Sequence, residues 1–91
     1  MSTHAETVEL LRQRLASLAP LWLEIVDDSH LHAGHAGARD GGGHFQVRIV
    51  AEAFAGKNTL ARHRLVFDAA GDLMRGRIHA LAIHARSPDE V

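Results

Sequence analysis

The chain has 91 residues and a mass of 9.9 kDa, which is room for one small domain only. It is 46% hydrophobic and 23% charged, a balance that is typical of folded globular proteins and excludes a disordered or fibrous chain. The formal net charge of −1 argues against nonspecific binding of nucleic acid by the molecule as a whole.

The first predicted element is an amphipathic helix over 3–18. Hydrophobic residues recur there at steps of three and four, and Thr3 and Glu6 have the spacing of a capping box. Pro20 ends the helix because helical geometry is disfavoured for the residue before a proline. A strand is predicted next, over 21–26, where side chains alternate between two faces.

A glycine-rich segment over 27–43 separates this strand from the next. It lacks a regular period, and a loop of this length in so small a domain is usually functional or disordered. A second strand is predicted over 44–51. Its side chains are Phe45, Val47 and Ile49 toward the core and His44, Gln46 and Arg48 toward water.

The C-terminal half is predicted to return to the same sheet. A turn over 54–58 leads to a helix over 59–70, a short helix over 72–75 and a third strand over 77–85. Alternation on that strand places His79, Leu81 and Ile83 on one face, and the Ser87-Pro88 pair is expected to end the ordered structure. The predicted order is α-β-β-α-α-β, with one sheet face left open for a partner.

Eight histidines and no cysteines are the unusual feature of the composition. The densest cluster, over 30–35, overlaps the HxHxDH pattern of metallo-β-lactamase-like hydrolases, but Gly34 stands where the aspartate is required. Those folds are also more than twice as long, so we interpret these histidines as solvated loop residues able to take up a metal. The absence of cysteine excludes disulfides, thiolate nucleophiles and an iron–sulfur site whose ligands all come from this chain.

His79 has two interpretations from the residues alone. It is either a satisfied core histidine or a single imidazole that projects toward a surface. His79 and His84 are five positions apart, so on a regular strand they face opposite sides and cannot bind one metal together.

A basic segment between Lys57 and Arg77 offers a separate hypothesis. Its five bases and two acids give a local charge of +3, which favours contacts with nucleic-acid phosphates. The bases are Lys57, Arg62, Arg64, Arg75 and Arg77. No nucleophile–base set, forced carboxylate pair or phosphate-binding glycine loop is present, so no enzyme is expected.

The setting is expected to be the cytoplasm, without a membrane. No apolar run approaches the roughly 20 residues of a membrane helix. The N-terminal stretch has an acidic, helix-starting pattern and no apolar segment suited to a signal peptide.

Several motifs along the chain resemble those of the BolA family, over about residues 6–86. They are Asp28-Ser29-His30-x-His32, His44-Phe45-x-Val47, Phe54-x-Gly56, Arg62-His63-Arg64-x-Val66 and Ile78-His79-Ala80-Leu81-Ala82-Ile83-His84. The resemblance implies a single BolA-like domain over 1–91 with an α+β, KH-like fold of the second type. In that fold a three-stranded mixed sheet carries its helices on one face, and the GxxG loop of nucleic-acid-binding KH domains is missing.

The resemblance further implies a non-enzymatic adaptor, a monomer or weak homodimer when alone. Such proteins bind a monothiol glutaredoxin and share a [2Fe–2S] cluster with it, acting in cluster trafficking and iron homeostasis. The family's C-terminal ligand falls on His79 and the loop ligand most nearly on His32, with His30 and His35 as alternatives. The isolated chain is expected to hold no tightly bound cofactor, and the face of His79, Leu81 and Ile83 is the expected docking surface. Some members are DNA-binding transcriptional regulators, so DNA is the alternative partner.

Overall fold

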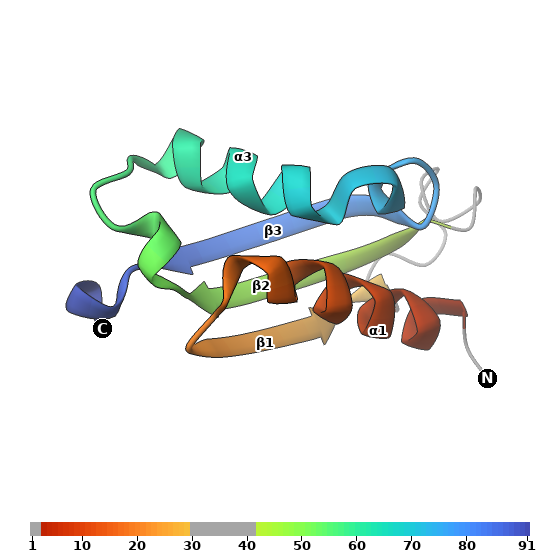
Figure 1. Ribbon diagram of the computed structural model, residues 1–91. Helices are drawn as coiled ribbons and strands as arrows, with labels where there is room; N and C mark the ends of the chain where they lie inside the picture. Colours follow the sequence, from red (N-terminus) through yellow and green to blue (C-terminus); the bar gives the residue numbers. More distant parts are fainter. Residues whose placement is uncertain (1–2, 30–41) are drawn as a thin grey trace.

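The computed structural model describes residues 3–29 and 42–91, which form two layers (Figure 1). One layer is a three-stranded sheet and the other contains two α-helices that cover a single face of it. The elements are α1 (Thr3–Leu15), β1 (Trp22–Asp27), β2 (Gly43–Val50), α3 (Thr59–Ala70) and β3 (Ile78–Arg86). The predicted α+β fold, with its helices on one face, is confirmed. The second of the two predicted consecutive helices is a 3₁₀ turn, η4 (Gly71–Met74).

The strands follow one another across the sheet in the order β1-β2-β3. β1 and β2 are antiparallel neighbours, with Ile25 opposite Val47, whereas β2 and β3 are parallel. The parallel pair requires a crossover, which α3 and η4 supply. β2 and β3 therefore both start at the end of the sheet where the segment 30–41 joins it, and both finish at the opposite end.

The helix ends follow local sequence signals. α1 gives way to a 3₁₀ turn at Ala16–Leu18, and Ala19, the residue before Pro20, adopts a left-handed φ of 50°. At the start of α3 the side chain of Asn58 accepts a hydrogen bond of 2.9 Å from the Ala61 N–H. The predicted capping box at Thr3 lies outside the described side chains.

The core lies between the helices and the covered face of the sheet. Leu11 and Leu15 contribute from α1, and every second residue of β2 faces them, as predicted. Phe54 is the largest of the fully buried side chains. It lies in a 3₁₀ turn, η3 (Glu52–Phe54). This residue belongs to the core, although the sequence pattern indicated only a turn at its position. No helix among the described residues is long and apolar enough to cross a membrane.

The prediction that order ends at Ser87-Pro88 is wrong. The chain continues into a 3₁₀ turn, η5 (Pro88–Glu90), and Ser87 is buried at its N-cap. Ser87 and Glu90 form a capping box, in which each side chain satisfies a backbone N–H of the other residue. The physical reason is that a proline at the first helical position starts a helical turn rather than ending one.

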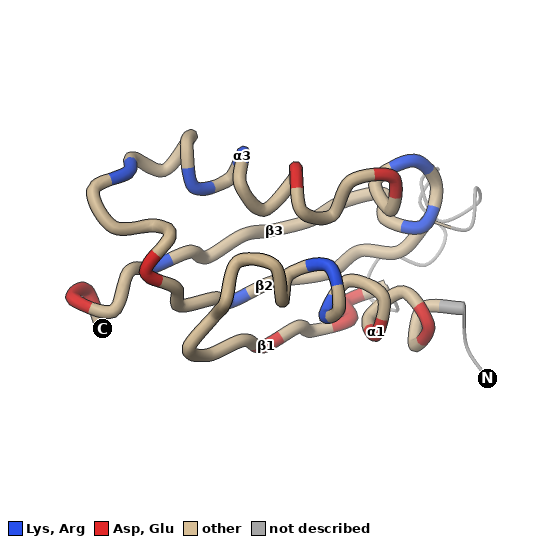
Figure 2. The backbone as a smooth tube through the Cα atoms, viewed as in Figure 1, with Lys and Arg blue, Asp and Glu red and all other residues tan. Residues whose placement is uncertain are grey.

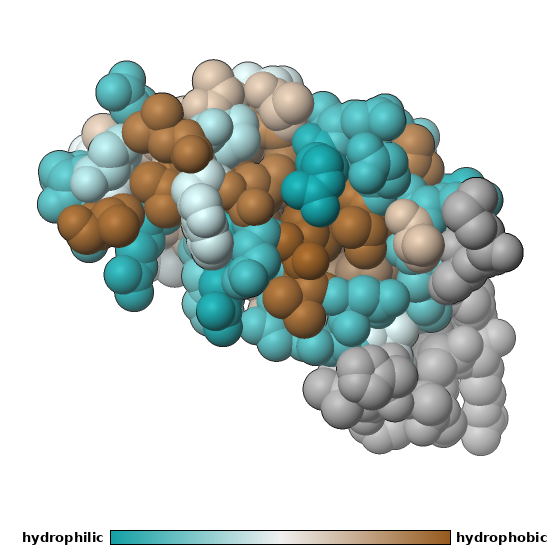
Figure 3. Space-filling view, turned by 90° about the horizontal axis from the view of Figure 1, so that it is seen from below, coloured by the Kyte–Doolittle hydropathy of each residue, from teal (hydrophilic) through white to brown (hydrophobic). Residues whose placement is uncertain are grey.

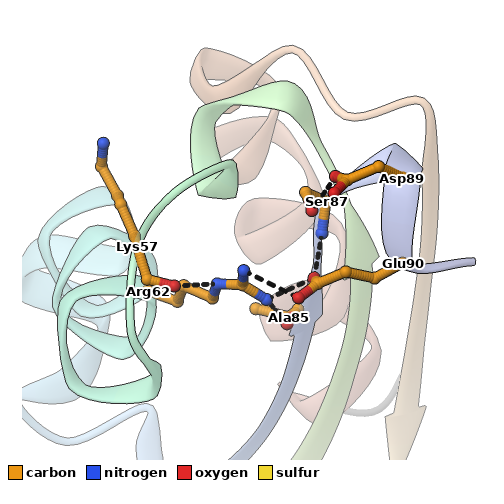
Figure 4. Close-up of polar contacts among 6 residues, drawn as sticks. All are labelled: Lys57, Arg62, Ala85, Ser87, Asp89 and Glu90. Carbon is orange, nitrogen blue, oxygen red and sulfur yellow. Dashed lines mark hydrogen bonds and ion pairs between the residues drawn. The ribbon is translucent and has the colours of Figure 1, made fainter.

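Arg62 joins this C-terminal turn to α3 (Figure 4). Its Nη1 and Nη2 atoms donate to the two carboxylate oxygens of Glu90 over 2.6 and 3.1 Å. Its Nε–H donates to the Lys57 carbonyl over 2.8 Å, and Nη1 also reaches the Ala85 carbonyl over 3.1 Å. All three guanidinium nitrogens of Arg62 thus donate hydrogen bonds within the protein. A phosphate bound by Arg62 would have to compete with these structural contacts.

Glu90 makes stability depend on pH. Its hydrogen bonds from the Arg62 guanidinium and from the Ser87 backbone N–H lower its pKa from 4.5 to about 2. A carboxyl group with a depressed folded-state pKa stabilises the fold fully above its unfolded pKa, and this contribution is lost as the pH falls from about 4.5 to about 2. In Glu90→Gln we expect this pH-dependent part of the free energy of unfolding to be missing.

Urea denaturation at several pH values measures this effect. The difference in unfolding free energy between the wild type and Glu90→Gln should shrink as the pH is lowered through that window. Glu9→Gln is the matched control, because Glu9 is exposed and lies 3.8 Å from Arg12. A difference between wild type and Glu90→Gln that stays constant with pH would contradict the assignment.

Candidate metal and partner site

A β-bulge places His79 at the start of β3. Gly43 pairs with Ile78, whereas its neighbour His44 pairs with Ala80, so β3 contributes one residue more than β2 at this point. His79 is that extra residue. It is exposed, although Ile78 beside it is buried in the core.

The bulge overturns the predicted docking surface of His79, Leu81 and Ile83. Leu81 and Ile83 lie on the face that the helices cover, where Leu81 packs against the core and Ile83 is only 8% exposed. A one-residue insertion reverses the inside–outside alternation of a strand, so His79 does not share their face. The prediction that His79 and His84 face opposite sides is wrong for the same reason, because the bulge places both on the open face of the sheet.

His44 is the nearest imidazole to His79. The centroids of the two rings lie 5.1 Å apart, and the rings are tilted by 44°. The backbone of His44 is fixed by the end of β1, because its N–H donates to the Ser29 Oγ over 3.1 Å and its carbonyl accepts from the Asp28 N–H over 2.8 Å. The two imidazoles therefore form a positioned pair at one end of the open sheet face.

Gly42 allows the start of β2 to lie directly against the bulge. A Cβ atom at this position would stand 2.9 Å from the His79 Cβ and 3.2 Å from the Gly76 carbonyl oxygen. The next residue, Gly43, donates its N–H to the Arg77 carbonyl over 3.0 Å. Glycine at position 42 is thus required by a close approach of two strands, and that approach sets the position of His79.

The other predicted metal ligands, His30, His32 and His35, lie outside the described residues. The residues that flank them are described, and both lie beside the histidine pair, with Ser29 bonded to His44 and Gly42 against His79. Among residues 3–29 and 42–91, no group of three or more potential ligands converges. Of the predicted ligands, only His79 is therefore placed by the structure, with His44 beside it.

Residues 15–90 match the family model described as BolA-like protein. The chain belongs to the BolA family. The resemblance that the sequence motifs indicated is thereby confirmed.

Two relatives and one solved structure show the extent of the similarity. The chain is 45% identical over 87 residues to SufE-like protein 1 of Arabidopsis thaliana, covering 89% of this chain but only 24% of that protein. It is 34% identical over 80 residues to the DNA-binding transcriptional regulator BolA of Escherichia coli (strain K12), covering 82% and 73% of the two chains. The structure of BolA1 from Arabidopsis thaliana superposes with a TM-score of 0.79 at 34% identity, over 93% of this chain and 95% of that one.

The described basic residues of this BolA-family chain are spread along several elements of the backbone (Figure 2). Arg62 is held by Glu90, and Arg77 lies 3.7 Å from Glu6 on α1. Of the five basic side chains between Lys57 and Arg77, three make no ion pair in the part of the chain that the structure describes. They are Lys57, Arg64 and Arg75.

Sequence reasoning missed His44 as a partner of His79. The alternation of β2 correctly placed His44 on the open face, but its contact with His79 depends on the bulge. The available signal was the pair of glycines at 42 and 43, because consecutive glycines before a strand often mark a bulge or a close backbone approach.

Proposed function

We propose that this protein is a non-enzymatic adaptor that binds a monothiol glutaredoxin and shares a [2Fe–2S] cluster with it. The observation that carries the proposal is the exposed His79 on its bulge, beside His44, in a chain without cysteine. A histidine that only filled the core would be buried, whereas this one is open to a partner. We place the function in cluster trafficking and iron homeostasis.

In this proposal His79 supplies one ligand and the segment 30–41 supplies a second, with His32 favoured over His30 and His35. His44 packs against His79 and positions its ring. The glutaredoxin supplies the thiolates that this chain lacks. When bound, the cluster provides one-electron chemistry and a transferable unit of iron and sulfide, and histidine ligation raises its reduction potential relative to all-cysteine ligation.

Anaerobic reconstitution of the purified pair tests this proposal. The chain is mixed with a monothiol glutaredoxin, iron and sulfide, and the product is followed by size exclusion, visible absorption and circular dichroism. We expect a heterocomplex whose spectrum differs from that of the glutaredoxin alone, and no cluster on this chain alone. The proposal fails if the two proteins elute separately under every condition.

DNA binding is a second candidate function. It is supported by Lys57, Arg64 and Arg75, which make no ion pair among the described residues and lie on or near α3, and by the E. coli relative that is called a DNA-binding regulator. If these three side chains contact phosphates, log affinity should fall with log salt concentration with a slope of about −2.7. Fluorescence anisotropy with a labelled duplex measures this slope. Binding that is undetectable, or independent of salt, would dismiss this candidate.

A further inference from the structure

A groove of about 760 Å³ lies at the end of the sheet opposite to His79. It opens on the sheet face that the helices leave uncovered, where Trp22, Val50 and Arg86 are neighbours on adjacent strands. Pro88 and Val91 of the C-terminal turn form a further part of its lining. In Figure 3 hydrophobic surface is visible at this end of the molecule, where the chain terminates in Figure 1. The volume lies within the range of small-molecule sites.

The groove combines one exposed aromatic ring with basic side chains. The Trp22 residue is 51% exposed, which is unusual for an indole that serves only the core. Across the sheet on the same face stands Arg86, which makes no ion pair among the described residues. Two strand spacings separate the two positions, about 9.6 Å. A ligand that fits this row has a planar group to stack on Trp22 and an anionic group to reach Arg86, with a short spacer between them.

The next row of the same face adds a second arginine and a histidine. There Arg48 and His84 are register neighbours and both line the groove. Glu24, the third member of the row, lies 3.6 Å from Arg48, and both are more than two-fifths exposed. Among the described residues that line the groove, Arg86 is therefore the arginine without a carboxylate partner, and it is the point at which an anion would bind.

A second hollow of about 210 Å³ adjoins the first on the far side of β3. His84 and Arg86 line both hollows, and the second one reaches the first residue of α3, Thr59. Arg62, which also lines this second hollow, is paired with Glu90. Arg86 therefore stands between the two hollows, in the direction in which a phosphate would extend from a ring on Trp22.

We propose that this groove binds a nucleoside phosphate, with the base stacked on Trp22 and the phosphate held by Arg86 and Arg48. Stacking explains the exposed indole and the apolar lining, and charge-assisted hydrogen bonds from guanidinium groups explain the two arginines. This site does not depend on the proposed glutaredoxin partnership, because it lies at the other end of the sheet and uses none of the proposed cluster ligands.

Intrinsic fluorescence tests the proposal in the full chain. Trp22 is the only tryptophan and there is no tyrosine, so emission reports on this groove alone. Titration with adenosine 5′-monophosphate, corrected for absorption with free N-acetyltryptophanamide, should give saturable quenching with a Kd of about 1 mM or tighter, equivalent to about −4.1 kcal/mol. Adenosine and inorganic phosphate should each bind more weakly, because each makes only half of the contacts.

Variants locate the site by isothermal titration calorimetry. We expect Arg86→Ala and Trp22→Leu each to weaken nucleotide binding about tenfold, which is what the loss of one charge-assisted hydrogen bond or one stacked base predicts. Arg12→Ala, which removes an exposed arginine from α1, should leave the affinity unchanged. The proposal is overturned if quenching does not saturate by about 10 mM, if inorganic phosphate binds as tightly as the nucleotide, or if a glutamate-rich peptide binds more tightly than either.

Discussion

Replacement of His79 by alanine is expected to abolish the circular dichroism signal of the cluster shared with a glutaredoxin. The bulge places this imidazole outside the core and next to the residues that flank the segment 30–41, and the sequence contains no cysteine to replace it. Loss of a direct metal ligand costs more than the 10- to 100-fold that is typical for an outer-shell residue. We therefore expect the signal to fall by about 100-fold or more.

Two matched variants separate ligand loss from misfolding. His63→Ala removes a part-exposed histidine on α3, away from the proposed cluster site, and should leave the signal intact. His79→Cys should restore a shared cluster with an altered spectrum, because a thiolate is also an iron ligand. An unchanged signal in His79→Ala would show that this residue does not bind the cluster, even if the two proteins still associate.

The same assay identifies the second ligand. His30→Ala, His32→Ala and His35→Ala are compared one at a time, and His32→Ala is expected to give the largest loss. His44→Ala should retain the cluster with a weakened or shifted signal, since His44 positions His79 in our proposal.

Replacement of Phe54 by alanine is expected to lower the free energy of unfolding by about 3–5 kcal/mol. Phe54 is 0% exposed and is among the largest fully buried side chains of the described chain. Its removal leaves a cavity in the hydrophobic core that neighbouring side chains cannot fill without moving. In a domain of this size such a loss is a large fraction of the total stability.

Urea denaturation followed by Trp22 fluorescence measures the loss. Phe67→Ala is the control, because Phe67 is 39% exposed and its truncation should cost much less. Phe54→Leu should retain most of the stability, since it keeps the site apolar and filled. A loss below about 1 kcal/mol in Phe54→Ala would be within the range of an ordinary substitution and would contradict a core role.

The order and type of the elements were predictable because hydrophobic period and capping residues act locally. The step of three and four in α1, the alternation in β2 and the asparagine before α3 each determine a structure over a few residues. The C-terminal turn was missed because Pro88 was interpreted as the end of order, although Ser87 and Glu90 have the local spacing of a capping box. Only the contact of Glu90 with Arg62, 28 positions away, leaves no local trace in the sequence.

The candidate site was predictable in part. The motif singled out His79, and the structure places this residue exposed at the start of β3. That His79 binds a cluster whose other ligands come from another molecule stays a prediction. The face on which His79 lies was not predictable from alternation. Alternation assigns faces by counting residues in steps of two, and one bulged residue reverses the assignment. Phe54 was missed for a related reason, since a single aromatic residue in a turn has no period that would mark it as buried.

Because β2 and β3 are parallel, the two candidate sites of the molecule lie at opposite ends of the sheet. One is at His79 and the other is at Trp22 and Arg86. Arg86 lies seven positions after His79, so the His79 end and the Trp22 end of the sheet are about 20 Å apart. A protein docked at one end leaves the other end accessible. At this separation, the effects of substitutions at the two ends on the free energy of unfolding are expected to be additive. Under the two proposals, a protein partner at the His79 end and a nucleoside phosphate at the Trp22 end would occupy separate surfaces of this 91-residue chain.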